Sequence, residues 1–402
     1  MSHHQFIKVE SRPYQTEILN DLVQAVESGL SSIVVDSPTG SGKTFMGLEA
    51  CRRLITDILP QKHGVSPDEI GVAWIAMRSN LLTATEEVNG QYFLDHLHSP
   101  EEGHKFCPNL HTISMFQRDS KFMRKYKIRI AVMDEAHHDT TESMARVYGD
   151  IDPQYCIGLT ATPFRMDQNR LGFQKVIKKA GYRYLIDDGY LAGFNHWSIS
   201  NDWSPEAVAK TYLESPDAWG SSVMFFLNRD ECETASRLLT EGGVKNTVVH
   251  GGSDREAQIE SLENGEVQVV ISMAILAEGF DYPALESVFV RDSQSKGLVM
   301  QMAGRALRKF TMADGSQKVA NIIQSSKADY PFTRFARARN QYVKSNDRWA
   351  SIKPNGNVDK HVEISLKSLV HAKIEKSTLN RLQERSKKKK VWKDPDSIKN
   401  KK

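Results

Sequence analysis

The chain has 402 residues, more than a single hydrophobic core usually organises, so its length favours two domains with extensions. Hydrophobic residues make up 40% and charged residues 26%, which is typical of soluble globular proteins. The sequence has no run of 18 apolar residues and no signal-peptide-like start. We therefore expect a cytoplasmic protein with no membrane partner.

The formal net charge of +3 hides an asymmetry, because residues 381–402 hold ten Lys or Arg against three Asp or Glu. This balance is not by itself evidence of nucleic-acid binding. The four cysteines, Cys51, Cys107, Cys156 and Cys232, lie too far apart for a CxxC pair or a dense disulfide framework. We interpret them as buried or incidental thiols.

Short β-branched runs separated by stretches long enough for helices predict a parallel α/β domain over residues 1–205. The runs are Ser32–Asp36, Val72–Ala76, Ile128–Met133 and Tyr155–Leu159. A second series begins near Ser222 and predicts a similar domain over 206–327. Residues 195–220 lack sustained periodicity and predict the boundary, while 328–402 form a basic C-terminal extension whose end is either a phosphate-binding or a disordered tail.

The segment Ser37–Thr44 follows the first strand and precedes a stretch, 45–57, that is predicted to be helical, which is the context of a P-loop. Two glycines allow the backbone to turn so that its N–H groups face phosphates. Lys43 is expected to neutralise the β- and γ-phosphates, and Thr44 to hold Mg²⁺. Ser37 departs from the usual glycine at the first position. The expected phosphate-binding residues are Pro38, Thr39, Gly40, Ser41, Gly42, Lys43 and Thr44.

Asp134 and Glu135 follow an apolar strand, at the end of a parallel strand where open α/β sheets bind ligands. Seen alone, such carboxylates more often belong to the start of a helix. Together with an upstream P-loop they predict that Asp134 holds Mg²⁺ and that Glu135 polarises the attacking water. The nearby His137 and His138, with His250, lack a convincing zinc ligand set.

With both motifs in one chain, the sequence resembles superfamily 2 helicases of the DEAH-containing type. The resemblance implies two tandem RecA-like α/β domains and covers residues 12–308. Arg12-Pro-Tyr-Gln15 looks like the family's adenine-contacting element, in which Arg12 and Gln15 are the candidates. Glu278-Gly-Phe-Asp281 resembles a motif that touches nucleotide and nucleic acid, so Gly279 and Asp281 join the nucleotide-binding set.

Residues 301–308 resemble the family's sixth motif, and Gln301, Arg305 and Arg308 are spaced to share one helical face. The resemblance implies that Arg305 and Arg308 act as arginine fingers on the γ-phosphate, in a site that forms when the two domains close. The alternative is a solvated basic helix face. The predicted catalytic residues are Lys43, Asp134, Glu135, Gln301, Arg305 and Arg308.

Other family positions predict a track for nucleic acid. Thr160-Ala-Thr-Pro163 looks like the motif that couples ATP to grip on the strand, although the same tetrapeptide also suits a simple turn. The expected nucleic-acid contacts are Arg78, Thr112, Thr160, Thr162 and Ser272. Within the superfamily, the sequence looks most similar to RadD-like and type III restriction-translocase-like helicases of bacteria and phages.

The resemblance implies an ATP- and Mg²⁺-dependent enzyme that moves on or unwinds single-stranded or branched DNA. An RNA helicase, or a nucleotide-switched binding module without turnover, are the alternatives. No zinc module is expected, because no cysteine follows Cys232. A monomeric motor is expected, since one chain holds every motif.

Overall fold

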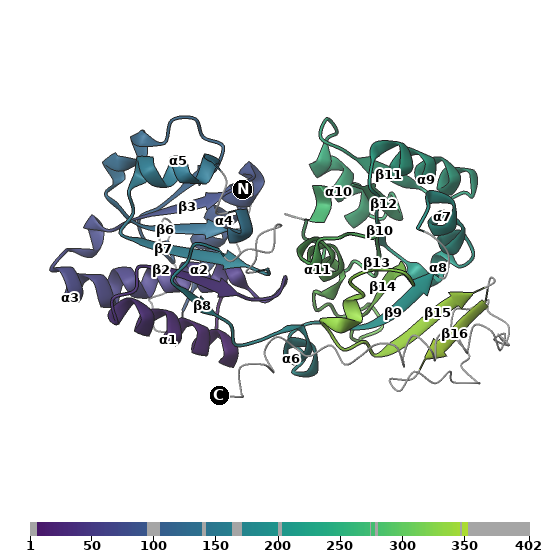
Figure 1. Cartoon of the computed structure of the whole chain (residues 1–402), viewed down its shortest axis with the longest axis horizontal. Coiled ribbons are helices and arrows are strands. Elements are labelled where there is room, and N and C mark those ends of the chain that lie inside the picture. The colour runs from purple at the N-terminus through teal and green to yellow at the C-terminus, as the bar shows by residue number, and fades with distance from the viewer. Residues whose placement is uncertain are drawn as a thin grey trace. The chain divides into compact units, whose positions relative to one another are not determined.

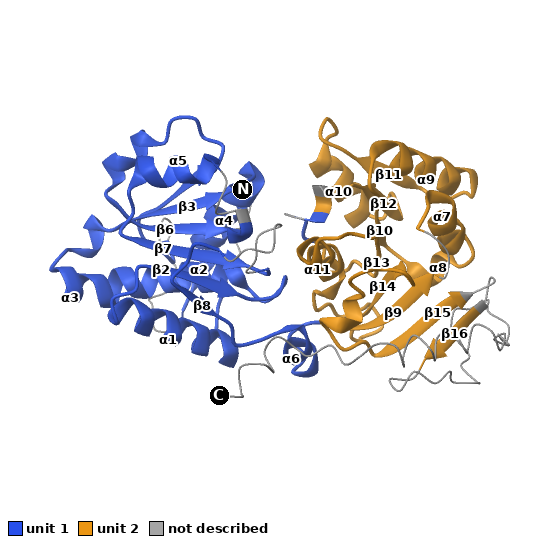
Figure 2. Cartoon of the chain, viewed as in Figure 1, with its two compact units in different colours: residues 1–191, 277–281 blue, residues 192–276, 282–402 orange. Residues whose placement is uncertain are grey.

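The computed structural model describes residues 6–94, 105–138, 142–162, 171–199, 203–273, 275–277, 280–345 and 348–352. The chain divides into two compact units, residues 1–191 with 277–281 and residues 192–276 with 282–402 (Figure 2). The division falls before residue 205, where the sequence predicts the boundary. No helix in the described part of the chain is long and apolar enough to span a membrane.

The first unit is built on a parallel sheet of six strands with helices on both faces (Figure 1). The predicted strand Ser32–Asp36 is confirmed with the same bounds, and the three others are confirmed within a residue or two. In sheet order the strands are β5 (Leu110–Ser114), β3 (Gly71–Ala76), β6 (Ile128–Asp134), β7 (Tyr155–Thr160), β2 (Ser32–Asp36) and β8 (Lys175–Ile177).

Side chains that alternate along the strands supply both faces of this sheet. Ile75 and Met133 point to the face covered by the helix α5, whereas Trp74 and Leu159 meet α2 on the other. Gly47 makes that second contact possible, because a Cβ there would lie 2.7 Å from both Leu159 and Trp74. The helices are α1 (Pro13–Glu27), α2 (Lys43–Arg53), α3 (Leu59–His63), α4 (Ser79–Gln91), α5 (Glu142–Ile151) and α6 (Tyr182–Asp187).

Two short strands, β1 (Ile7–Lys8) and β4 (Tyr92–Phe93), pair with each other outside this sheet. The predicted helix over 45–57 begins two residues earlier and changes at Leu54 into a π-helical turn, Leu54–Ile58. The first unit therefore places the end of β2 and the start of α2 on either side of the predicted phosphate loop.

The second unit has an eight-stranded sheet that is parallel except for its last pair. In sheet order the strands are β11 (Asn246–Val249), β12 (Val269–Ser272), β10 (Ser222–Phe225), β13 (Ser287–Val290), β14 (Val319–Ser325), β9 (Gly193–Ile199), β15 (Asn340–Ser345) and β16 (Arg348–Ile352). Its helices are α7 (Pro205–Leu213), α8 (Pro216–Trp219), α9 (Arg229–Glu241), α10 (Arg255–Glu263) and α11 (Lys296–Gly304).

The residues expected to form the boundary instead form part of this second core. Trp197 of β9 stacks on Tyr342 with ring centroids 3.9 Å apart, and it meets Trp219 and Trp349 edge-on. The alternation in this short strand was obscured by the polar residues around it. Buried aromatic pairs of this kind add to the free energy of burial, so they hold β9 in the second unit.

The sequence predicts that the C-terminal extension begins at residue 328, but the sheet of the second unit continues beyond that point. The strands β15 and β16 continue the sheet of the second unit to Ile352, and their aromatic residues complete its core. The basic run Lys387–Lys390 lies outside the described residues. Both units are therefore α/β domains with mostly parallel sheets, as the sequence predicted.

Candidate nucleotide-binding site and nucleic-acid interface

The loop between β2 and α2 has the backbone of a phosphate cradle. Gly40 and Gly42 adopt positive φ angles of 81° and 80°, a region that disfavours other residues. Gly42 caps α2 without any side-chain hydrogen bond to the first turn of the helix. The first N–H groups of a helix have no partner within it, and the helix dipole is positive at this end. This end of α2 is therefore suited to an anion.

Two residues of α1 hold this loop in place. The hydroxyl of Tyr14 donates to the carbonyl of Ser41 at 2.6 Å, and Gln15 Nε2 donates to the same oxygen at 2.9 Å. A Cβ on Gly42 would lie 2.6 Å from Gln15 Nε2, so the helix and loop fit closely. Burial raises the pKa of Tyr14, so the hydroxyl keeps its proton as a donor.

The predicted adenine contacts lie beside this loop. Gln15 is 4% exposed and its Oε1 accepts from the backbone N–H of Arg12 at 2.9 Å. The Arg12 guanidinium lies 5.2 Å from the centre of the Tyr190 ring. A primary amide has two N–H donors, so Gln15 retains one beyond its bond to Ser41. Contact of Arg12 and Gln15 with a base stays a prediction.

The acidic motif begins where β6 ends, at Asp134. The backbone N–H of Glu135 donates to Asp134 Oδ1 at 3.0 Å, and Glu135 has a positive φ of 52°. This conformation is costly for a residue with a side chain and is concentrated at functional sites. Its Oε2 is buried without a hydrogen bond and lies 3.4 Å from His137 Nδ1. The turn therefore holds a carboxylate oxygen ready for a partner.

Thr160 links this turn to the end of the neighbouring strand. Its Oγ1 lies 3.4 Å from His137 Nδ1 and accepts from the backbone N–H of Thr162 at 3.0 Å. Since β6 and β7 are paired in register, Asp134 lies opposite Leu159, beside Thr160. The structure thus brings the acidic and threonine motifs together. Pro163 lies outside the described residues.

These residues fit a nucleotide and a divalent cation. The start of α2 offers backbone donors and the partly exposed Lys43 and Thr44, all suited to phosphate and metal oxygens. The buried Glu135 Oε2 lacks a hydrogen-bond partner, as expected of a group that would act on a bound water. Asp134 and Thr44 would hold Mg²⁺, which would supply charge neutralisation for the phosphates.

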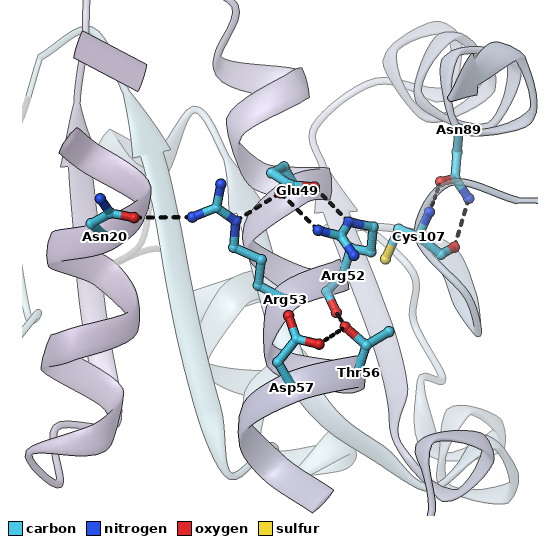
Figure 3. A network of polar contacts seen from close by, with 8 residues as sticks. All are labelled: Asn20, Glu49, Arg52, Arg53, Thr56, Asp57, Asn89 and Cys107. Atoms are coloured by element: carbon cyan, nitrogen blue, oxygen red, sulfur yellow. Dashed lines mark hydrogen bonds and ion pairs between the residues drawn. The ribbon is translucent and has the colours of Figure 1, made fainter. Parts of the chain in front are cut away.

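Away from the phosphate loop, α2 is fixed by a buried carboxylate (Figure 3). Glu49, 2% exposed, accepts from Arg52 Nε and Arg53 Nε, both at 2.7 Å. Arg53 also donates to Asn20 of α1 at 3.1 Å. The hydrogen bond with Glu49 raises the pKa of Arg52. No sequence motif predicts this network, which joins α2 to α1 and so supports the loop.

In the second unit, the arrangement of Gln301, Arg305 and Arg308 differs from the prediction. The helix α11 ends at Gly304, a 3₁₀ turn spans Arg305–Leu307, and Arg308 is extended with ψ of 137°. The three residues therefore do not share one face of an α-helix. Gln301 and Arg305 are 4% and 5% exposed, so the core of the unit fixes their positions. Their catalytic role, with that of Arg308, stays a prediction.

A buried lysine lies near these arginines and was missed in the sequence. Lys318 is 3% exposed, and its ammonium donates to the carbonyls of Pro283 and Leu285. Burial lowers its pKa to about 7, with Arg308 adding to that effect and Glu286 opposing it. Lys318 thereby fixes the segment that follows Asp281. The Asp281 side chain is exposed. Gly279 lies outside the described residues.

The predicted nucleic-acid contacts fall into two groups. Thr160, Thr162 and Ser272 are buried, and hydrogen bonds within the protein hold the two threonines at a strand end. Thr112 lies mid-strand in β5 and donates to Glu86, whereas Arg78 precedes α4 at the end of β3. Of the five, Arg78 is placed best to reach a nucleic-acid strand at the carboxyl edge of the sheet of the first unit. Contact of all five with nucleic acid stays a prediction.

Comparison with known proteins agrees with this geometry. Residues 8–165 match the family described as the type III restriction enzyme res subunit, and residues 205–310 match the helicase conserved C-terminal domain. A Saccharomyces cerevisiae protein named as an ATP-dependent helicase, IRC3, is 24% identical over 342 residues, which cover 74% of this chain and 49% of that protein. The chain spans about half the length of the curated relatives it matches.

Two solved structures show the same fold. An HsdR subunit fragment of a type I restriction enzyme from Vibrio vulnificus YJ016 has a TM-score of 0.57 at 16% identity, covering 84% of this chain and 69% of that one. The ATP-dependent type ISP restriction-modification enzyme LlaBIII, bound to DNA, has a TM-score of 0.56 at 15% identity, covering 79% and 28%. With its two matched domains and tandem α/β units, the chain belongs to the superfamily 2 helicases and resembles the type III restriction group.

Proposed function

We propose that this chain is a nucleic-acid-stimulated ATPase that couples ATP hydrolysis to movement on DNA. The observation that carries the proposal is the pairing of an uncapped α2 N-terminus with the buried Glu135 oxygen at the same edge of one sheet. One feature suits a chain of phosphates, and the other suits the water that attacks them. Structural relatives include an enzyme bound to DNA, which supports the choice of DNA.

The residues of the first unit divide the work of hydrolysis. Backbone N–H groups at the start of α2 bind phosphate oxygens, and Lys43 adds a positive charge. Glu135 orients a water molecule for attack and accepts a proton from it. Tyr14 and Gln15 keep the loop in its phosphate-binding shape through the carbonyl of Ser41.

Steady-state ATP hydrolysis tests the proposal. The full chain would be measured with Mg²⁺ alone and with single-stranded, duplex or forked DNA, or RNA. We expect DNA to stimulate turnover and Lys43→Ala to reduce it about 100-fold or more, because a charge aimed at the transferred phosphate is lost. Lys179→Ala is the matched control, since this lysine pairs with Asp21 of α1.

The other outcomes assign other functions. Stronger stimulation by RNA than by any DNA would make the chain an RNA-dependent enzyme. Nucleotide binding without turnover in every condition would make it a nucleotide-switched binding module. Equal loss in Lys43→Ala and Lys179→Ala would contradict the role of Lys43 in the phosphate site.

A further inference from the structure

An exposed aromatic side chain lies directly after the edge strand of the first unit. Phe116 is 56% exposed, more than any other phenylalanine among the described residues. Its backbone is nevertheless fixed, because its N–H donates to Ser114 Oγ at 3.2 Å and Gln117 N–H donates to the Ser114 carbonyl at 2.9 Å. Arg146 of α5 also donates to the carbonyl of Gln117 at 3.0 Å. The ring is thus presented to solvent by a held turn.

The sheet register brings the backbone of Phe116 level with that of Arg78. Met115 N–H donates to the Ala76 carbonyl at 3.0 Å, so the ends of β5 and β3 are level with each other. Phe116 then follows β5 just as Arg78 follows β3. All strands of this sheet are parallel, so these two ends lie at the edge that also carries the phosphate loop and Asp134. An aromatic ring and a cation therefore project from neighbouring strand ends.

The segment that begins with Phe116 carries mostly positive charge. Residues 116–121 contain Arg118 and Lys121 against one carboxylate, Asp119, whereas Lys127 and Arg129 lie at the start of β6, at the opposite edge of the sheet. Arg118 and Lys121 are exposed, next to the ring in the sequence. Proteins that hold single strands combine such cations, which contact phosphates, with aromatic rings on which bases stack. The charge complements a polyanion rather than an apolar protein surface.

We propose that Phe116 is a base-stacking contact for an unpaired nucleotide of a strand lying along the carboxyl edge of this sheet, with Arg78 and Arg118 on the phosphates beside it. The inference rests on the proposed function and names a residue that makes contact through a base rather than through the backbone. Stacking does not read sequence, because every base has an aromatic face. The exposed Phe116 ring would thereby stack on a base when nucleic acid is bound.

Fluorescence anisotropy with labelled oligo(dT) tests this contact in the full chain. We expect Phe116→Ala to weaken binding about fivefold or more, from the usual loss of one stacked base, and Phe116→Trp to keep it. A strand of the same length with abasic sites should bind the wild type and Phe116→Ala equally, since it offers no base to stack. Phe122→Ala is the matched control, because Phe122 is 46% exposed in the same basic segment.

The arms separate failure of this inference from failure of the proposed function. If the wild type binds DNA and its hydrolysis is stimulated by DNA, but Phe116→Ala binds DNA with unchanged affinity, only the stacking contact is overturned. An equal loss on normal and abasic strands would also overturn it, since the ring would then act on the fold or the phosphates. A wild-type chain that binds no nucleic acid would overturn the proposed function together with the contact.

Discussion

The two units each contain a helix that begins after a central parallel strand, and the two helices begin in opposite ways. In the first unit α2 follows β2 and has Gly42 at its cap, with no side-chain hydrogen bond. In the second unit α9 follows β10, and Asn228 Oδ1 accepts from the Glu231 N–H at 2.9 Å. Glu231 also accepts from the Leu227 N–H at 2.9 Å. The first turn of α2 therefore has no side-chain cap, which we call an open helix start, whereas side chains of the same segment cap the first turn of α9, which we call a filled helix start.

This difference shows that the same strand–helix arrangement can either offer a phosphate site or not. A carboxylate in the first turn satisfies the helix dipole of α9 from within, so that turn has little to offer an external phosphate. At α2 the same electrostatic preference is left for a ligand. A parallel α/β sheet thus provides the position, while the residues at one turn decide whether it becomes a phosphate site.

The largest expected effect is on hydrolysis at the first unit. Glu135→Gln should lower the rate of ATP hydrolysis by about 100-fold or more, because an amide cannot accept the proton of the attacking water. Nucleotide binding should remain, since the start of α2 is unchanged. Rapid-quench hydrolysis and fluorescent-nucleotide binding would measure the two separately. Normal hydrolysis in this variant would show that Glu135 does not accept this proton and would refute its proposed role.

The next largest effect concerns how the open helix is held. Glu49→Gln should lower the free energy of unfolding by about 3 kcal/mol, because it leaves two arginines around a buried site without their carboxylate. Urea unfolding followed by circular dichroism would measure it. Glu233→Gln in α9 is the control, since its pair with Arg229 is exposed and should be worth less than about 1 kcal/mol. Equal losses of unfolding free energy in Glu49→Gln and Glu233→Gln would contradict the stronger role of the buried ion pairs in α2.

The second unit should show its own dependence on pH through Lys318. Its folded pKa, about 7, lies below the ordinary value of 10.5, so above pH 7 the unfolded chain holds a proton that the folded chain lacks. Stability relative to Lys318→Met should therefore rise with pH above 7, by at most about 1.4 kcal/mol per unit, and stay level below 7. Urea unfolding of both proteins between about pH 6 and pH 9 would measure this. A constant difference would refute it.

The smallest effect should come from the filled helix start. Asn228→Ala should lower the free energy of unfolding by about 1 kcal/mol, because the N–H of Glu231 loses its cap. Nucleotide affinity should not change. Thermal unfolding and nucleotide titration of the same protein would test both statements. A marked loss of nucleotide affinity would show that α9 has a ligand role and would break the contrast with α2.

Sequence reasoning succeeded where one local pattern determines one local structure. The strand at Ser32–Asp36 was predicted with its bounds, because β-branched runs in a parallel sheet are buried on both faces. The positive φ angles of Gly40 and Gly42 follow from the same kind of reasoning. These features depend on neighbours in the sequence.

It failed where distant residues decide the outcome. The strand β9 exists because Trp197 meets Trp219, Tyr342 and Trp349, and no local signal joins these residues. The helical face expected for Gln301, Arg305 and Arg308 was lost because α11 ends at Gly304. The exposure of Phe116 and the burial of Lys318 likewise depend on packing that spacing alone does not report.

The position of β9 also sets an order for the folding of the second unit. This first strand lies between β14 and β15, and the bond from Trp197 Nε1 to Asn321 joins residues 124 positions apart. Contacts between residues so distant in the sequence close large loops and slow folding. On a ribosome, β9 must wait for nearly the whole unit to emerge before its neighbours exist. A separately expressed second unit should therefore begin at Ala192, because one starting at residue 206 would lack a central strand of its sheet.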